Sequence, residues 1–421
     1  MRRRLSPVVG LMRFAALIAG AGIFIAPFRG TAGFRATLLA IAALAIVDAH
    51  RRSGQLRLLV PPDLPLRLAV AAWVLCAIAW SFVGPAWLGS LATVKGDIVI
   101  PIVAFLVFYA LTRTRRDFMR WVWVLAAGLV VLTAMVIREP YDPSVAAPEP
   151  AYVTVGWLTL WLVVVAPALV VPLFASRRGG GTLQAVVLVG VSGACLLVAA
   201  SLSGNRVIWA CFAAMVVVAT ALGLRGLTTA RERWRLILIA SVPLLISGVF
   251  LADSMRFRVE ATASAGQGPI SFMLNDSRVP IWREALAMIG EHPLAGFGYA
   301  NPDIGDAFSA RFDDPVFRQI FRHAHNVVLD YTLQMGVTGG IVVVALFAAL
   351  AWAFFRRARA RGLARLAGLC GIALVTGVFL RNMTDDFFAR HGILIFAAVA
   401  GMFLGLGTHR PPLAQQPPQP D

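Results

Sequence analysis

The sequence predicts an all-α polytopic membrane protein with about twelve transmembrane helices and one large helical periplasmic loop. Two observations support this fold class. Of the 421 residues, 59% are hydrophobic and only 14% are charged, whereas a soluble domain is about 45 to 50% apolar and about 25% charged. The apolar residues also form continuous runs near the roughly 20 residues that a transmembrane helix needs. Lipid offers the backbone no hydrogen-bond partners, so such runs must be helical, and they lack the alternation of barrel strands.

The apolar runs define twelve spans in chain order. They cover residues 7–28, 34–49, 66–83, 97–112, 119–137, 155–175, 183–202, 207–224, 236–252, 326–355, 363–380 and 391–407. The first follows three arginines, as in a signal peptide, but its apolar run is too long for one, which predicts an uncleaved span. The four cysteines lie inside these runs without the spacing of metal ligands or of a disulfide framework.

The basic residues predict the orientation of the spans. Placing Arg2, Arg3 and Arg4 inside puts 23 basic residues in the inner segments and 7 in the short outer loops. Cytoplasmic loops retain such an excess of arginine, so we expect both termini in the cytoplasm. The net charge of +17 does not indicate nucleic-acid binding, because the arginines lie in short clusters between apolar runs.

This topology divides the chain into four parts. We expect spans one to nine in residues 1–252, a periplasmic loop in 253–324, spans ten to twelve in 325–408, and a disordered cytoplasmic tail in 409–421.

The long loop contains signals for two helices of its own. Asp276 or Ser277 can cap the first, which has Pro280 in its first turn and ends near Gly290. Its expected apolar face consists of Trp282, Ala285, Leu286 and Ile289. The second begins at Asp314 and Pro315, and its stripe consists of Val316, Phe317, Ile320 and Phe321. These stripes predict that the loop folds onto the membrane surface as a lid.

Three basic side chains at outer boundaries are candidates for chemistry. His325 begins the tenth span, where an imidazole suits proton transfer because its ordinary pKa lies near neutrality. Arg206 ends the turn before the eighth span, and Arg278 starts the first loop helix. Two guanidinium groups can hold a diphosphate bidentately and stabilise it as it leaves. The alternatives are a histidine that caps a helix start and arginines that snorkel to the interface.

A glycine-rich, aromatic stretch runs from Trp282 to Tyr299 and contains the segment from His292 to Gly298. Glycine lets the backbone approach a ligand closely, which is the role we expect for this turn. It is not a nucleotide fingerprint, because no strand precedes it.

These motifs together resemble the O-antigen ligase and polymerase superfamily. His325-Asn326, followed by nine residues, Gly336, two residues and Gly339, is similar to the signature of that family. The stretch from Trp282 to Gly298 is similar to its motif of a Trp, a helix and a His-Pro-Leu-x-Gly-x-Gly turn. The segment from Ser201 to Arg206 resembles its upstream Ser/Arg motif.

The resemblance implies a glycosyltransferase without cofactor or metal. It implies a donor glycan on undecaprenyl diphosphate and an acceptor sugar hydroxyl of lipid A core, joined with inversion on the periplasmic face of the bacterial inner membrane. His325 is then the general base or the group that positions the hydroxyl, while Arg206 and Arg278 hold the diphosphate.

Asp313/Asp314 looks like a helix cap, and Asp385/Asp386 looks like a structural ion network rather than a metal site.

Four further residues are candidates for supporting roles: Arg318, Arg322, His323 and Asn326. Within a helix, His323 would point about 200° away from His325, so we expect at most a supporting role for it. Arg318 and Arg322 share a helix face and either extend the phosphate site or belong to solvated surface.

Three rival functions remain open on the sequence alone. An O-antigen polymerase and a protein oligosaccharyltransferase of the same superfamily differ from a ligase in the acceptor. A lipid-linked glycan flippase or a solute transporter belongs to another class. Transporters place charges near the bilayer midplane, whereas here, Arg13 apart, the candidate charges gather at the outer boundary.

Overall fold

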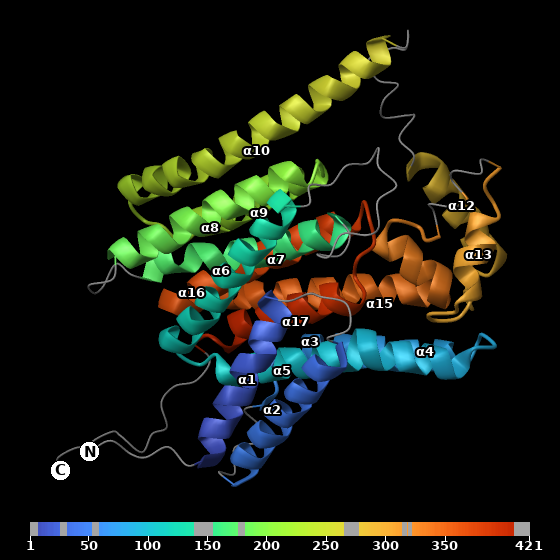
Figure 1. Cartoon of the computed structure of the whole chain (residues 1–421), viewed down its shortest axis with the longest axis horizontal. Helices are drawn as coiled ribbons and strands as arrows, with labels where there is room; N and C mark the ends of the chain where they lie inside the picture. Colours follow the sequence, from blue (N-terminus) through green and yellow to red (C-terminus); the bar gives the residue numbers. More distant parts are fainter. Residues whose placement is uncertain are drawn as a thin grey trace.

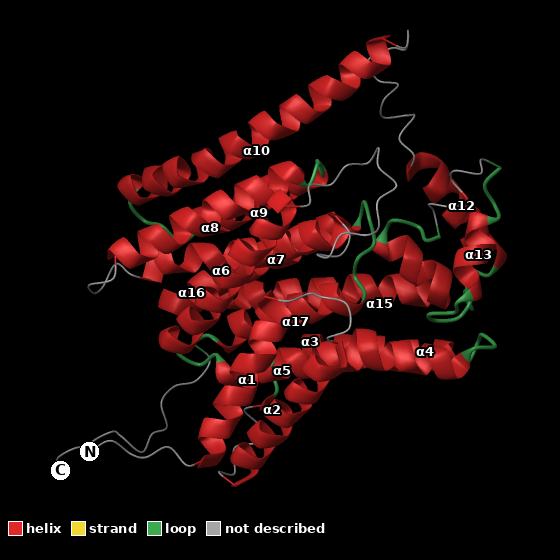
Figure 2. Ribbon diagram, in the orientation of Figure 1, coloured by secondary structure: helices red, strands yellow, loops and turns green. Residues whose placement is uncertain are grey.

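The computed structural model describes residues 7–25, 32–52, 59–138, 155–175, 182–264, 278–313, 318 and 322–407. This part of the chain contains helices and no strand (Figure 2). Nine of its helices are long and apolar enough to cross a membrane. Three shorter apolar helices, Arg13–Phe24, Gly156–Pro172 and His391–Gly405, accompany them. The protein is therefore an all-α polytopic membrane protein, as predicted.

The helices follow the predicted spans closely (Figure 1). In chain order the membrane helices are α1 (Pro7–Ile25), α2 (Ala32–Arg52), α3 (Leu64–Ser81), α4 (Trp87–Val94) continued by the π-helical turn η2 (Lys95–Val99) and by α5 (Ile100–Leu111), α6 (Arg115–Arg138), α7 (Val155–Ala175), α8 (Thr182–Leu202), α9 (Val207–Leu224), α10 (Ala230–Ser264), α15 (Val327–Ala358), α16 (Gly362–Asn382) and α17 (Arg390–Gly405). The ninth span ends near residue 252 as predicted, because its apolar window closes at Asp253, although α10 continues as a helix to Ser264.

The centre of the bundle consists of α16 and α17, which pack against α5, α7, α9 and α15. Glycines on α17 allow its close approach to α5. A Cβ atom on Gly401 would lie 2.3 Å from the carbonyl oxygen of Phe105, and one on Gly405 would lie 2.4 Å from that of Tyr109. Small residues let membrane helices pack backbone to backbone in this way. At the periphery, α10 runs along one edge (Figure 1), with 11% of its membrane window buried against 56% for α16.

The loop helices α12 (Arg278–Glu291) and α13 (Asp303–Ser309) form a small core of their own against α15. Ile281, Ala285 and Met288 of α12 are buried, together with Phe308 of α13 and Leu333 of α15. The predicted helix is confirmed, with Pro280 in its first turn, but its apolar face is rotated. Leu286, expected on the buried face, is 58% exposed.

Helix α12 begins at Arg278, and its two expected capping residues, Asp276 and Ser277, lie outside the described residues. The second expected loop helix falls mostly outside them as well. Asp314, Pro315, Val316, Phe317, Ile320 and Phe321 are not described. The packing of α12 on α15 gives the apolar stripe of the first helix a protein partner, where we had expected the membrane surface.

The glycine-rich turn fills a break in α15, where its glycines approach the backbone of that helix. Gly336 has a left-handed φ of 64°, so the helix is interrupted there. The backbone N of Phe297 donates to the oxygen of Leu333, and that of Gly298 donates to the oxygen of Gln334, both at 2.9 Å. In return, the backbone N of Val337 donates to the oxygen of Pro293 at 2.8 Å. The turn thus satisfies the backbone groups that the break leaves unpaired.

Candidate active site

His325 lies in the short segment that leads into α15, at the end of the bundle where α12 packs. Its φ of 49° places it in the left-handed region, which a residue with a side chain seldom adopts. Such a conformation persists where the surroundings fix it, and it occurs often at functional sites. Its backbone N donates to Nδ1 of His323 at 3.3 Å, and the two imidazole rings stack with centroids 4.0 Å apart. Because the segment is not helical here, the two rings share a site, contrary to the expectation.

The imidazole of His325 contacts a carboxylate from the loop between α16 and α17. Nδ1 of His325 lies 2.8 Å from Oδ1 of Asp385. Both side chains are largely buried, with 18% and 17% of their surface exposed. A carboxylate only accepts hydrogen bonds, so this contact places the proton of a neutral imidazole on Nδ1 and leaves Nε2 as the proton acceptor. A carboxylate that orients a histidine in this way is the arrangement of a general-base dyad.

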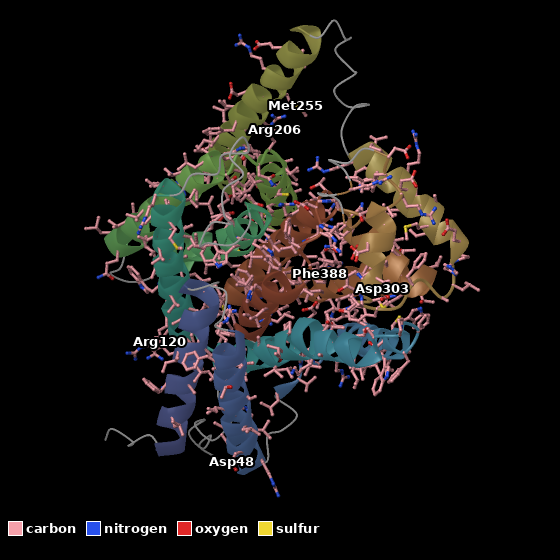
Figure 3. All side chains as sticks on the ribbon, turned by 45° about the vertical axis from the view of Figure 1, so that its right-hand side comes forward. Asp48, Arg120, Arg206, Met255, Asp303 and Phe388 are labelled. Carbon is pink, nitrogen blue, oxygen red and sulfur yellow. The ribbon has the colours of Figure 1, made fainter. Side chains whose placement is uncertain are left out.

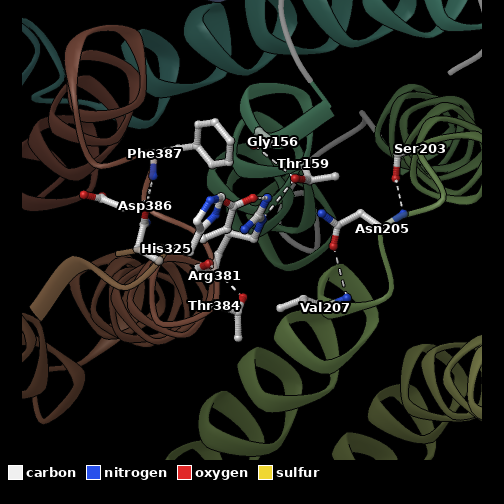
Figure 4. Close-up of polar contacts among 12 residues, drawn as sticks. Gly156, Thr159, Ser203, Asn205, Val207, His325, Arg381, Thr384, Asp386 and Phe387 are labelled. Carbon is white, nitrogen blue, oxygen red and sulfur yellow. Dashed lines mark hydrogen bonds and ion pairs between the residues drawn. The ribbon is translucent and has the colours of Figure 1, made fainter. Parts of the chain in front are cut away.

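A buried arginine holds the far side of Asp385. The Nη2 of Arg381 lies 3.3 Å from Oδ2 of Asp385, and its Nε donates to the hydroxyl of Thr159 on α7 at 3.0 Å. Its guanidinium also lies over the ring of Phe387, 5.3 Å from the centroid. Figure 4 shows this group of contacts around His325. The side chain of Arg381 has no exposed surface, so its charge acts on Asp385 with little screening.

Burial and neighbouring charges shift the pKa values of Asp385 and His323, the two titratable side chains that contact His325. Burial alone would raise the pKa of Asp385, but the hydrogen bond from His325 and the charge of Arg381 outweigh it and leave the pKa below its ordinary value. Burial, followed by the neighbouring His325, lowers the pKa of His323. Asp385 is therefore ionised and His323 is neutral near neutral pH.

The loop that carries Asp385 is tied to two predicted site residues. The Nε of Arg278, the first residue of α12, donates to the carbonyl oxygen of Thr384 at 2.7 Å. The Nδ2 of Asn326 donates to the carbonyl oxygen of Met383 at 3.1 Å. The Oδ1 of Asn326 also accepts from the backbone N of Val328 and of Leu329, which caps α15. Arg278, Asn326 and His325 thus converge on one loop.

Arg206 lies directly before α9, in a turn at the same end of the bundle (Figure 3). Ser203 and Asn205 shape this turn, since Oγ of Ser203 accepts from the backbone N of Asn205 and Oδ1 of Asn205 accepts from that of Val207. In the view of Figure 4, the amide of Asn205 points toward the side of the picture where Thr159 and Arg381 lie. Helix α9 packs against α16, the helix that carries Arg381.

Two of the supporting candidates lie apart from this site. The guanidinium of Arg322 contacts Oδ1 of Asp306 on α13, where 57% and 74% of the two side chains are exposed. The Nε of Arg318 contacts the carbonyl oxygen of Phe312, and its side chain is exposed. Both belong to the solvated surface of the loop.

The carboxyl group of Asp386, the next residue after Asp385, does not take part in the dyad and has other neighbours. Its Oδ1 accepts from the backbone N of Phe388 at 2.9 Å. Burial and then the neighbouring Asp330 raise its pKa well above the ordinary value. The expected ion network is therefore correct for Asp385, which pairs with Arg381, whereas Asp386 faces another carboxyl group. The side chain of Arg390, the other expected partner, is not described.

His323, His325 and Asp385 are also a set that metal ions can use, because their ligand atoms lie within 4.8 Å of one another in the described part of the chain. The contact between Nδ1 of His325 and Oδ1 of Asp385 has the length of a hydrogen bond. These two atoms point at each other, and a shared ion would have to separate them. A hydrogen-bonded dyad accounts for the geometry, so we derive no step through a metal.

The residues that sequence reasoning missed as site members are Asp385, Arg381 and Thr159. A signal for two of them was present, since Arg381 and Asp385 are four residues apart at the outer end of a span. Thr159 gave no signal, because it is one hydroxyl in an apolar helix.

Comparison with family models finds a match that spans part of the chain. A family model described as O-antigen ligase matches residues 162–344, from α7 into α15. The matched region includes Arg206, Arg278 and His325. A comparison with curated proteins finds no match. This region is therefore similar to the O-antigen ligase family, which confirms the resemblance to the O-antigen ligase and polymerase superfamily.

Proposed function

We propose that the chain is an O-antigen ligase. It transfers a glycan from undecaprenyl diphosphate to a sugar hydroxyl of lipid A core, on the periplasmic face of the bacterial inner membrane. The observation that carries the proposal is the dyad of His325 and Asp385 beside a loop that Arg278 also contacts. A base and a cation at one membrane boundary are what an acceptor hydroxyl and a lipid diphosphate require.

The reaction follows from the protonation of the dyad. Nε2 of His325 takes the proton of the acceptor hydroxyl as its oxygen attacks the anomeric carbon of the donor. The new glycosidic bond forms on the face opposite the diphosphate, so the anomeric configuration inverts. The bond from carbon to phosphate oxygen breaks, and its electron pair stays with undecaprenyl diphosphate. Asp385 stabilises the imidazolium that forms.

The two predicted arginines neutralise the leaving diphosphate. Arg278 at the start of α12 adds its charge to the helix N-terminus, which favours an anion. Arg206 approaches from the start of α9. Positive charge that meets the diphosphate as it departs lowers the barrier without a metal.

The test is glycan transfer by purified protein supplied with a lipid-linked glycan and lipid A core. We expect His325→Ala to abolish the product and Arg278→Ala or Arg206→Ala to weaken donor use about tenfold or more. Arg283→Ala is the matched control, since Arg283 is an exposed arginine on the same helix. It should retain the activity of the parent.

The product identifies the acceptor. A glycan joined to lipid A core supports the ligase, whereas a longer glycan still on undecaprenyl diphosphate would indicate a polymerase instead. Full activity of the His325→Ala variant would refute the role of the dyad.

A further inference from the structure

A cavity lies at the end of the bundle opposite His325, between α1, α2, α5 and α6. Its volume is about 500 Å³, within the range of small-molecule sites. The His325 site and the cavity lie at opposite ends of helix α17. The loop with Asp385 comes directly before the first residue of α17. After the last residue of α17, the backbone N of Gly407 donates to the carbonyl oxygen of Arg113, which lines the cavity. The proposed transfer does not use this space.

Three arginines from separate elements line the cavity: Arg13 of α1, Arg113 before α6 and Arg120 of α6. Among the described lining residues, Asp117 is the single acid. Its Oδ2 accepts from the hydroxyl of Thr114 at 2.7 Å and closes the first turn of α6. Its Oδ1 lies 3.5 Å from Arg120. One carboxylate with a structural role does not balance three guanidinium groups, so the cavity keeps an excess of positive charge.

The charge of Arg13 is the least expected, because it is the seventh residue of an otherwise apolar helix. It makes no hydrogen bond or ion pair with any residue that the structure describes. Arg113, by contrast, is fixed, since its Nε donates to the carbonyl oxygen of Ala110 at 2.9 Å and its Nη2 contacts Nε2 of His50. A cation inside a membrane helix needs water or an anionic partner. The cavity supplies the place for such a partner beside Arg13.

Apolar side chains continue the cavity toward the lipid. Phe14 and Leu17 line it and are 61% and 45% exposed, on the same helix as Arg13. Trp121 closes the inner wall and is 6% exposed. Figure 3 shows Arg120 at the end of α6 that lies against α1. The cavity thus joins a cationic centre to an apolar surface that faces the membrane.

We propose that this cavity binds an anionic phospholipid. Its phosphodiester lies among Arg13, Arg113 and Arg120, and an acyl chain lies along Phe14 and Leu17. Basic pockets between membrane helices suit such headgroups. A free phosphate would match the arginines but would leave the apolar wall uncovered, whereas a neutral phospholipid would match the wall but would add no net charge.

The experiment is native mass spectrometry of the purified full chain with phosphatidylglycerol, and with phosphatidylcholine for comparison. The parent should bind phosphatidylglycerol preferentially. Because each arginine near a headgroup contributes about fivefold in affinity, Arg13→Gln combined with Arg120→Gln should weaken binding about twenty-five-fold. Arg116→Gln is the matched control, since Arg116 is an exposed arginine one residue into the same helix but outside the cavity. It should change the affinity less than about twofold.

A second variant keeps the charges and fills the apolar wall. Leu17→Trp should also reduce phosphatidylglycerol binding, and it remains informative if the double arginine variant does not fold. If Arg116→Gln lowered the affinity for phosphatidylglycerol as much as the double variant does, diffuse surface charge would account for binding and the proposal would be overturned. Equal binding of phosphatidylcholine and phosphatidylglycerol by the parent would also overturn it. Full competition by glycerol 3-phosphate or inorganic phosphate would identify a soluble anion as the ligand and refute the lipid. Each readout is binding, so it is independent of the transfer reaction.

Discussion

Asp385 is the residue on which the geometry of the candidate site depends most directly. It accepts from His325 with one oxygen and from Arg381 with the other. We expect Asp385→Asn to lower kcat at least about a hundredfold, because an amide no longer fixes the tautomer or stabilises the imidazolium. The KM for the donor should stay close to that of the parent, since Asp385 positions the base and does not hold the diphosphate.

Steady-state kinetics of the purified variant check this expectation. Asp306→Asn is the control, because Asp306 is an exposed acid paired with Arg322 away from the dyad. A large rise in KM with unchanged kcat would assign Asp385 to donor binding and contradict the positioning role.

His323 predicts how stability depends on pH. Burial, and then the neighbouring His325, lower its pKa in the folded state below the ordinary 6.5. The unfolded chain therefore binds this proton more readily, so stability rises with pH and is lost as the pH falls below about 6.5. We expect the thermal midpoint to fall less steeply on acidification in His323→Gln than in the parent.

Thermal unfolding on either side of pH 6.5 measures this difference. His292→Gln is the control, because the side chain of His292 is exposed in its turn. Identical pH profiles for the parent and His323→Gln would show that the buried imidazole carries no such dependence.

At the scale of elements, the break in α15 is the feature with the largest expected effect on folding. A Cβ atom on Gly336 would lie 2.2 Å from the carbonyl oxygen of Leu294, at a φ of 64°. Gly362 has the same φ with nothing within 4 Å of such an atom. Gly362→Ala should therefore cost only the conformational term, roughly 1 to 2 kcal/mol. Gly336→Ala should cost about 3 kcal/mol or more, because backbone must also move.

The thermal midpoints of the two variants in detergent test this comparison. Equal midpoints would mean that the turn from Pro293 to Gly298 does not depend on its fit into the break.

The elements also show what the sequence can and cannot predict. The spans followed from hydropathy, because lipid imposes the same requirement on every segment. The rotation of α12 did not follow, since Ile281 and Met288 are buried by contacts with α13 and α15 that are remote in sequence. The role of Gly296 and Gly298 was also missed. A glycine that approaches a ligand and one that approaches another backbone give the same local pattern.

At the scale of the whole molecule, the site draws residues from segments far apart in the chain. His325 was predictable because a motif surrounds it. Asp385 and Thr159 were not identified as its neighbours, because 60 residues separate Asp385 from His325 and only packing of α7 on α16 brings Thr159 to Arg381. The sequence thus indicated His325, Arg206 and Arg278, whereas the side chains that contact His325 and Asp385 were identified only from the three-dimensional structure.

The topology itself remains a prediction with a direct test. We expect Asp303 on α13 and Arg361 between α15 and α16 to face opposite sides of the membrane, because one helix separates them. In intact spheroplasts, a membrane-impermeant maleimide should label Asp303→Cys. It should label Arg361→Cys only after permeabilisation. The parent is the background control, since Cys76, Cys211 and Cys370 are buried and Cys195 is partly buried. Labelling of both variants from outside would refute the assigned orientation.

The location of Asp385 late in the chain has a consequence for biogenesis. A ribosome delivers Arg206, Arg278 and His325 before α16 exists, and Asp385 emerges only after that helix has been made. A nascent chain that stops before residue 383 therefore holds its imidazole without the carboxylate that orients it. If the proposed function is correct, the site is completed only in this late step of synthesis, and we expect incomplete chains to transfer no glycan.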